Sequence, residues 1–149
     1  MQNENAFLLL PPIFIIGFVG LWIFVCFLLA RIGGWSRLAT HYRAPADFSG
    51  TKWEFQTGYM GWARYKGCLT IGTNREGLYL AVFPLFRVGH PPLLIPWRDI
   101  TTSEERGWLA SYQGFAFAKA PNIQLHVLRE LGTRIISAQS SLTTTTGEG

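Results

Sequence analysis

Residues 11–30 read Pro-Pro-Ile-Phe-Ile-Ile-Gly-Phe-Val-Gly-Leu-Trp-Ile-Phe-Val-Cys-Phe-Leu-Leu-Ala. As an α-helix this run would be about 30 Å long, which is the thickness of the hydrocarbon core of a bilayer. No charged side chain occurs between Phe7 and Ala30, and Gly33 and Gly34 then provide residues suited to end a helix. The sequence therefore predicts a transmembrane helix over residues 7–32, preceded by a short tail of residues 1–6.

A cleaved signal peptide is the alternative for this segment. Such a peptide has a basic N-terminal region, a shorter apolar core and a cleavage site between small residues. The residues before the apolar run carry Glu4 and no Lys or Arg, and the stretch Leu28-Leu-Ala-Arg-Ile is a poor cleavage site. The sequence favours a membrane anchor.

Positive charge lies on one side of the predicted helix. All 13 Lys and Arg residues come after residue 30, and the net charge is +4. Arg31, Arg37 and Arg43 flank the C-terminal end of the helix, so the positive-inside rule predicts an external N-terminus and a cytoplasmic domain at the inner (plasma) membrane. The two cysteines, Cys26 and Cys68, lie inside and far outside the apolar run, and they are expected to remain unpaired.

A short collar over residues 33–45 follows the predicted span. Ser36 is placed to cap a helix, in which four apolar residues form one stripe at helical spacing. The stripe consists of Trp35, Leu38, Ala39 and Tyr42. This helix can lie along lipid headgroups with its arginines on phosphates, or its stripe can pack on the following domain, and the sequence leaves both open.

Short runs of alternating apolar and polar residues over 46–137 predict a β domain. Residues 73–77, with the sequence Thr-Asn-Arg-Glu-Gly, form a strong turn signal between strands at 68–72 and 78–83. The other expected strands are at 52–56, 61–66, 93–97, 108–112, 115–119 and 123–127. Residues 100–107 are expected to form a polar turn.

The end of the chain is less regular. A short C-terminal helix beginning near residue 128 is favoured over a final hairpin, and the Ser/Thr-rich residues 138–149 predict a disordered tail. The predicted fold is one N-terminal transmembrane helix plus a small, mainly β domain of about seven antiparallel strands in a partly open barrel.

Two strings carry a resemblance to a known superfold. Asn74-Arg-Glu-Gly-Leu-Tyr-Leu80 and Leu94-Ile-Pro-Trp-Arg-Asp-Ile100 resemble segments of the pleckstrin-homology-like (PH/GRAM) superfold. Over residues 34–136 the chain also resembles a group of bacterial membrane-anchored proteins, through Gly34-Trp-Ser-Arg-Leu-Ala39 and the string at 85–97. The resemblance implies a PH-like barrel, but that superfold hosts lipid-binding, peptide-binding and scaffolding modules and so assigns no activity.

The sequence holds no recognisable catalytic apparatus. No phosphate-binding loop, nucleophile elbow or zinc motif occurs, so no enzyme activity, cofactor or metal is expected. Glu104 and Glu105 are adjacent on a polar segment, which is typical of a solvated surface. The many aromatic residues are needed to fill a small β core, so nucleic acid is not an expected partner.

Basic residues form the one suggestive constellation. Lys52, Arg64 and Lys66 resemble in spacing the cations that grip inositol phosphates in PH domains. Together with Arg37 and Arg43 of the collar, they are predicted to contact anionic lipid headgroups. Strands also place Lys and Arg outward by default, which is the alternative reading of these positions.

The loop over residues 83–92 is the predicted protein-docking segment, through Phe86, Arg87 and His90. His90 stands in a rigid Gly-His-Pro-Pro turn that is expected to be exposed, and its ring either binds a partner or caps a carbonyl that fixes the turn. The predicted function is a non-catalytic, membrane-anchored binding or scaffold module that contacts membrane lipids. The alternative is an accessory subunit that docks through its β domain on a membrane protein partner.

Overall fold

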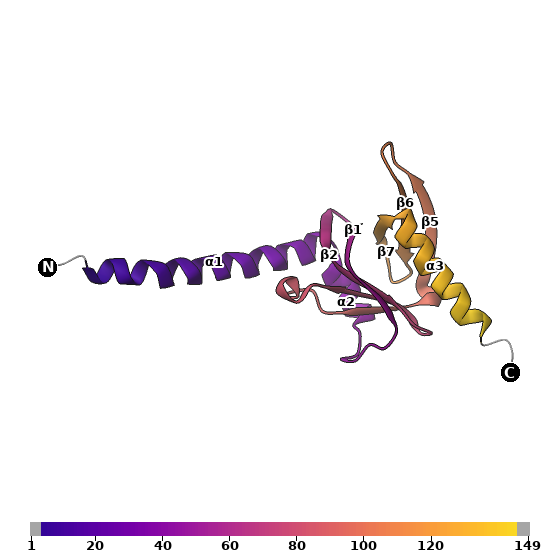
Figure 1. Ribbon diagram of the computed structural model, residues 1–149, viewed down its shortest axis with the longest axis horizontal. Helices are drawn as coiled ribbons and strands as arrows, with labels where there is room; N and C mark the ends of the chain where they lie inside the picture. The colour runs from indigo at the N-terminus through magenta and orange to yellow at the C-terminus, as the bar shows by residue number, and fades with distance from the viewer. Residues whose placement is uncertain (1–3, 146–149) are drawn as a thin grey trace.

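A single long helix projects from the rest of the protein. The computed structural model describes residues 4–145, and α1 (Glu4–Ile32) extends away from a β domain (Figure 1). This helix is long and apolar enough to span a membrane, and its most apolar window is only 11% buried. Residues 4–6, which we expected in a short tail, form its first turn, and the helix ends directly before Gly33 as predicted.

Seven strands form one antiparallel sheet in the order β4-β3-β2-β1-β7-β6-β5. A C-terminal helix, α3 (Arg129–Thr144), follows the last strand. The predicted layout of one apolar helix, seven antiparallel strands and a C-terminal helix is therefore confirmed. The strands are β1 (Thr51–Met60), β2 (Ala63–Thr73), β3 (Gly77–Val82), β4 (Leu93–Pro96), β5 (Ile100–Arg106), β6 (Ser111–Phe117) and β7 (Ala120–Leu128).

Three details of the strand prediction were wrong. The strands expected at 108–112 and 115–119 are one strand, β6, and residues 107–110 lie outside any strand. The strands expected at 61–66 and 68–72 are one continuous strand, β2, in which Gly67 has a φ of 63°. The segment 100–107, expected as a turn, contains β5, which pairs with β6 along its whole length. Because β5 is an edge strand with nearly every side chain exposed, it lacks the apolar alternation that identifies a half-buried strand.

The core lies between the sheet and two helices. The apolar residues of α2 (Trp35–Tyr42) are buried, namely Trp35, Leu38 and Tyr42. The stripe therefore packs on the domain and does not lie on headgroups, and the cap residue is Gly34, with a φ of 81°, in place of Ser36. On the other side of the core, Leu131 and Ile135 of α3 are buried where this helix lies against β6.

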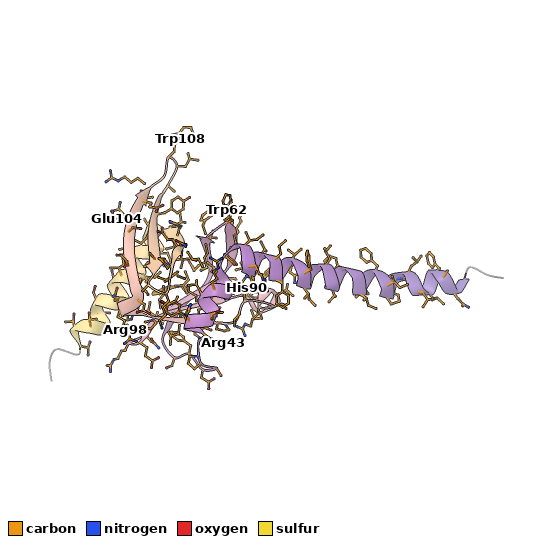
Figure 2. The ribbon with its side chains drawn as sticks, turned by 180° about the vertical axis from the view of Figure 1, so that it is seen from behind. Arg43, Trp62, His90, Arg98, Glu104 and Trp108 are labelled. Atoms are coloured by element: carbon orange, nitrogen blue, oxygen red, sulfur yellow. The ribbon has the colours of Figure 1, made fainter. Side chains whose placement is uncertain are left out.

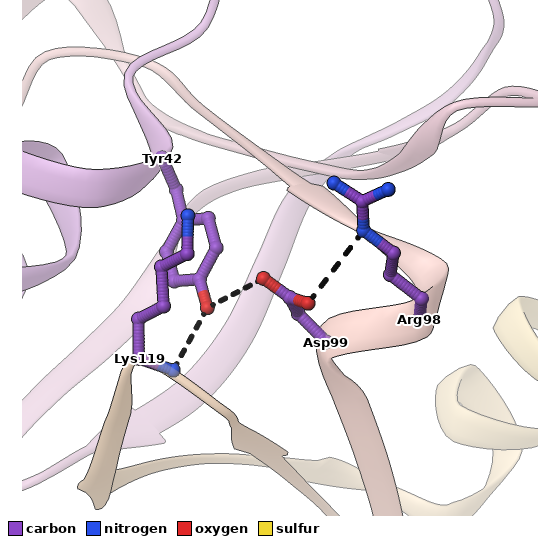
Figure 3. A network of polar contacts seen from close by, with 4 residues as sticks. All are labelled: Tyr42, Arg98, Asp99 and Lys119. Carbon is purple, nitrogen blue, oxygen red and sulfur yellow. Dashed lines mark hydrogen bonds and ion pairs between the residues drawn. The ribbon is translucent and has the colours of Figure 1, made fainter.

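A polar network joins α2 to the start of β5 and to the β6–β7 turn (Figure 3). The hydroxyl of Tyr42 donates to Oδ2 of Asp99 at 3.1 Å and accepts from the backbone N–H of Lys119 at 3.0 Å. Asp99 also pairs with Arg98 at 3.9 Å. Asp99 precedes β5 and Lys119 lies between β6 and β7, so one tyrosine ties the collar helix to two separate chain segments.

The Ser/Thr-rich segment after residue 137 is helical, so the prediction of disorder was wrong up to Thr144. Hydroxyl groups there donate to backbone carbonyls one turn earlier, as Ser140 does to Ile136 at 3.0 Å and Thr144 to Ser140 at 2.9 Å. These bonds supply local polar partners for residues of low helix propensity. The remainder of the predicted tail, residues 146–149, lies outside the described residues.

Candidate functional site

The connection between α1 and the β domain is tight. A Cβ on Gly33 would lie 2.8 Å from the Cβ of Ala63 and 2.9 Å from the hydroxyl of Tyr65, both on β2. Gly34 needs its left-handed conformation to start α2 at once, and a Cβ there would meet Ile123 at 2.5 Å. The two glycines therefore bring the helix end against the sheet with no linker between them.

The loop before β4 lies alongside the last turns of α1. The indole Nε1 of Trp22 donates to the carbonyl oxygen of Leu85 at 3.3 Å, and its ring lies 5.2 Å from that of Phe86. Further along, a Cβ on Gly89 would be 3.1 Å from the ring of Phe27. The loop thus follows α1 from Phe27 back to Trp22, and Cys26 and Ala30 of this stretch of the helix are buried.

His90, which lies where α1 meets the β domain (Figure 2), links this loop to Tyr65 of β2. Its side chain is buried, with Nδ1 at 3.1 Å from the carbonyl oxygen of Val88 and Nε2 at 3.1 Å from the hydroxyl of Tyr65. Because a carbonyl oxygen only accepts, Nδ1 carries the hydrogen and Nε2 accepts from Tyr65. The expectation that His90 is exposed was wrong, and the contact of its ring with a carbonyl is the second of the two alternatives considered for it.

Burial determines the charge state of this pair. It lowers the pKa of His90 below its ordinary value of 6.5, against the backbone hydrogen bonds with Val88 and Phe86, which raise it. It also raises the pKa of Tyr65 far above its ordinary value. Trp35 covers the same pair, with its ring 5.3 Å from that of His90 and its Nε1 donating to Pro91 at 2.8 Å. Both groups are therefore neutral near pH 7.

The three strand cations predicted as one site lie apart. Arg64 pairs across the sheet with Tyr59 and places its guanidinium 5.2 Å from that ring, close to the β1–β2 turn. Lys52 pairs with Gly72 near the other end of β1. Seven residues of strand, roughly 20 Å, separate the two positions along β1. Lys66 is exposed on β2, and the structure does not bring it to Lys52.

The collar cations are also separate from one another. Arg37 is exposed on α2 and lines a shallow hollow with His41, Lys119 and Asn122. Arg43 is exposed at the end of α2, where its backbone bridges to Leu93 of β4. Neither residue lies beside Lys52.

A different hollow on the outer face of β1, β2 and β3 has two cations among its lining residues. It has a volume of about 250 Å³. Lys52 borders it from β1 and Arg87 from the loop beside α1, while Glu54 is the one carboxylate among its lining residues. Cys68 and Thr70 of β2 and Tyr79 of β3 form its floor.

The position of Lys52 is set by aromatic rings. Its Nζ lies 5.4 Å from the ring centroid of Phe48 and 5.5 Å from that of Tyr79, and these rings stack on each other at 4.2 Å. Cation–π contacts of this kind hold an ammonium group without neutralising its charge. Neither Lys52 nor Arg87 has an ion pair with any other described residue.

Strained backbone lies at the rim of this hollow. Phe55 has a φ of 56°, the one positive φ of a non-glycine residue among residues 4–145, at an irregularity of β1 between Trp53 and Gln56. Its exposed ring lies 6.0 Å from that of Phe83. Bulky residues adopt this conformation rarely, and such strain clusters at ligand-binding positions.

The comparisons with known proteins do not extend this description. No family model matches the sequence, and no curated protein or solved structure matches it. Within residues 4–145, no cluster of His, Cys, Asp and Glu could hold a metal ion. Burial raises the pKa of Cys68, which is therefore a thiol near pH 7. Glu104 forms a surface ion pair with Arg129, and a carboxylate oxygen of Glu105 lies 3.2 Å from Nε2 of His126.

Sequence reasoning missed two features. Lys52 and Arg87 line the same hollow because of the fold of a loop 35 positions after Lys52, and no local sequence pattern predicts this. The second feature is the tip of the β5–β6 hairpin, where Trp108 and Leu109 are 99% and 93% exposed and project away from α1 (Figure 2). The Gly107-Trp-Leu-Ala string was a possible signal, because Gly107 precedes a tight reversal.

Proposed function

We propose that this protein is a single-pass, membrane-anchored, non-catalytic binding module whose β domain is held against the membrane surface. The observation that carries the proposal is the packing of the 83–90 loop on the last turns of α1. A domain on a free tether would leave the end of the helix uncovered. Here helix and domain share a buried interface, which also argues against removal of α1 as a signal peptide.

The length of the apolar stretch supports a position for the loop. The uncharged residues 7–30 would extend about 36 Å as a helix, against about 30 Å for the hydrocarbon core. With α1 spanning the bilayer, its last turns enter the headgroup layer. Gly89, beside Phe27, is then at the boundary of the hydrocarbon, and Leu85, beside Trp22, lies about 7 Å deeper, inside it.

The composition of the loop fits that depth. Its exposed side chains include Phe83, Leu85 and Val88, which suit contact with lipid. Three of its backbone N–H groups are paired within the loop: that of Phe86 bonds to Phe83, that of Arg87 to Pro84 and that of His90 to Arg87. Paired backbone groups are what a water-poor interface requires.

The proposed orientation places the N-terminus outside and the β domain in the cytoplasm, at the inner (plasma) membrane. Arg31, Arg37 and Arg43 follow the span, and no basic residue precedes it. The non-catalytic role rests on the state of the two most reactive side chains near the hollow and loop. His90 is buried and hydrogen-bonded, and Cys68 is held as a thiol.

A depth measurement tests the proposal. In a chain with Cys26→Ala and Cys68→Ala, a single Leu85→Cys carries an environment-sensitive fluorophore, and the full chain is reconstituted in lipid nanodiscs. Quenching by nitroxide-labelled lipid at Leu85 is expected. The matched control is Thr101→Cys on the exposed strand β5, which we expect to remain unquenched. A probe at Leu85 that reports water to the same extent as Thr101 would show the loop outside the membrane.

A second candidate function, an accessory subunit of a membrane complex, has one specific observation in its favour. Trp108 and Leu109 form a nearly fully exposed apolar tip that no described residue covers. Purification in mild detergent tests it by comparing the unchanged chain with Trp108→Ser/Leu109→Ser. A stoichiometric partner that is retained by the first and lost by the second would support this role.

A further inference from the structure

We infer that the hollow between Lys52 and Arg87 holds the phosphodiester of a bilayer phospholipid, as a resident lipid beside α1. This inference rests on the proposed function, because it needs the loop at the membrane surface. It assigns a ligand to a place that differs from the predicted cation set, since Arg64 and Lys66 do not line the hollow.

The depth of Arg87 is the first argument. This residue stands in the loop between Leu85, which contacts Trp22, and Gly89, which lies against Phe27. With α1 spanning the bilayer, that position is just inside the hydrocarbon, below the headgroup layer. A guanidinium at this depth extends toward phosphates, because its long stem can stay in apolar surroundings while its charge reaches the headgroup layer.

Charge balance is the second argument. Lys52 and Arg87 supply two positive charges to the lining, and Glu54 supplies one negative charge, which leaves a net charge of +1. Neither cation is neutralised by an ion pair with another described residue. A phosphodiester carries a single negative charge and matches this balance, and a guanidinium is well suited to bind two of its oxygens.

Size and surroundings are the third argument. A volume of about 250 Å³ is below the range of roughly 300–1,000 Å³ typical of pockets for drug-sized ligands, so the hollow fits a headgroup phosphate better than a large soluble cofactor. Thr70 and Tyr79, whose side chains carry hydroxyl groups, are among its lining residues. The exposed rings of Phe55 and Phe83 border it with apolar surface, on which the glycerol and first acyl carbons of a lipid can lie.

The test uses the full chain in detergent and native mass spectrometry with added phosphatidylglycerol. The variant Lys52→Gln/Arg87→Gln is expected to weaken lipid binding at least tenfold. The matched control is Arg64→Gln/Lys66→Gln, which removes the same charge outside the hollow and is expected to stay within twofold of the unchanged chain. Equal weakening by both pairs, or no binding by the unchanged chain, would overturn the inference. Thermal unfolding of each variant checks that the domain remains folded.

Soluble glycerophosphoglycerol, the deacylated phosphodiester of phosphatidylglycerol, separates the two sources of the same chemistry. Displacement of bound phosphatidylglycerol by millimolar glycerophosphoglycerol would support the phosphodiester site. Binding of glycerophosphoglycerol by a chain that ignores the lipid would overturn the lipid source. The Leu85 depth probe keeps the two proposals distinct. If lipid quenches the probe at Leu85 but Lys52→Gln/Arg87→Gln does not weaken lipid binding, only the lipid assignment of the hollow is wrong. If the probe at Leu85 is not quenched, the proposed position of the loop in the membrane is wrong.

Discussion

The two ends of the β domain differ in how far their aromatic and apolar side chains are packed. At the α1 end, Trp22, Trp35 and His90 make ring contacts and hydrogen bonds, and glycines let the backbones approach closely. At the β5–β6 end, the strand is exposed along its length and Trp108 is 99% exposed. The first end is built as a fixed joint. The second leaves an aromatic side chain and an edge strand open to whatever approaches the domain.

This difference bears on where each proposed function belongs. A fixed joint can hold a lipid in a defined hollow, because its walls come from α1's neighbouring loop and from the sheet. An open edge can pair with an added strand, since its backbone N–H and C=O groups on one side have no partner strand. The following predictions test the contrast through free energies of unfolding, measured in detergent by tryptophan fluorescence.

The largest expected effect is at the joint. Gly34→Ala should lower the free energy of unfolding by about 2–4 kcal/mol, since it combines left-handed strain with overlap on Ile123. Gly67→Ala is the matched control: its φ is also positive, but nothing lies within 4 Å of the new Cβ. We expect it to cost about 1 kcal/mol, from backbone strain alone. Equal losses at both positions would mean that the joint is not tightly packed.

The joint should also weaken in acid. The pKa of His90 is lowered on folding, so the unfolded chain binds more protons below about pH 6.5 and stability is lost as the pH falls through this region. We expect a lower midpoint of thermal unfolding at pH 5.5 than at pH 7.5. His90→Gln should flatten this dependence at a cost of about 1–3 kcal/mol at pH 7.5, from lost buried hydrogen bonds.

The exposed His41 is the control for that experiment. His41→Gln should leave the pH dependence unchanged, because this residue lies outside the joint. A profile that flattens with His41→Gln and persists with His90→Gln would contradict the role given to the buried ring.

An intermediate effect is expected at the hydrogen bonds that tie α2 to the start of β5 and to the β6–β7 turn. Tyr42→Phe removes the hydroxyl that bonds Asp99 and Lys119, and should cost about 1–2 kcal/mol. Tyr112→Phe is the comparison, since no hydrogen bond of its hydroxyl occurs within the described residues, and it should stay within about 0.5 kcal/mol. Similar losses for both variants would mean that the hydrogen bonds of Tyr42 shown in Figure 3 do not stabilise the packing of α2.

The smallest effect is expected at the hairpin tip. Trp108→Ser/Leu109→Ser should change the free energy of unfolding by less than about 0.5 kcal/mol, because neither side chain is buried. A loss as large as that of Gly34→Ala would show that the tip packs on the protein and is not an open surface.

The sequence predicts features that follow from local pattern. The uncharged run of 7–30 and the turn at 73–77 predict α1 and the β2–β3 hairpin, and both are present. Prediction from the sequence fails where the burial of a segment depends on contacts with distant parts of the chain. β5 carries polar residues because no layer covers it, and the helical residues after 137 look like a tail because their hydroxyls find backbone partners only once the helix forms.

The site was less predictable than the fold. Lys52 was named from its strand, but its neighbour in the hollow is Arg87, whose place depends on the loop packing against α1. His90 was expected to be exposed because the turn residues around it are typical of surfaces, whereas the helix and Trp35 cover it. Contacts between distant segments, and not the residue types themselves, place Arg87 beside the hollow and bury His90.

The glycine joint has a mechanical consequence. With no flexible linker between α1 and the sheet, helix tilt and domain orientation become a single degree of freedom. Spanning helices tilt by about 20° on average and adjust to bilayer thickness. If α1 spans the bilayer, a thinner membrane would tilt the helix. The β domain would then rotate with the helix by the same angle. The hairpin carrying Trp108 projects sideways from the axis of α1 (Figure 2), so this rotation would change the height of its tip above the lipid surface more than that of residues near the axis.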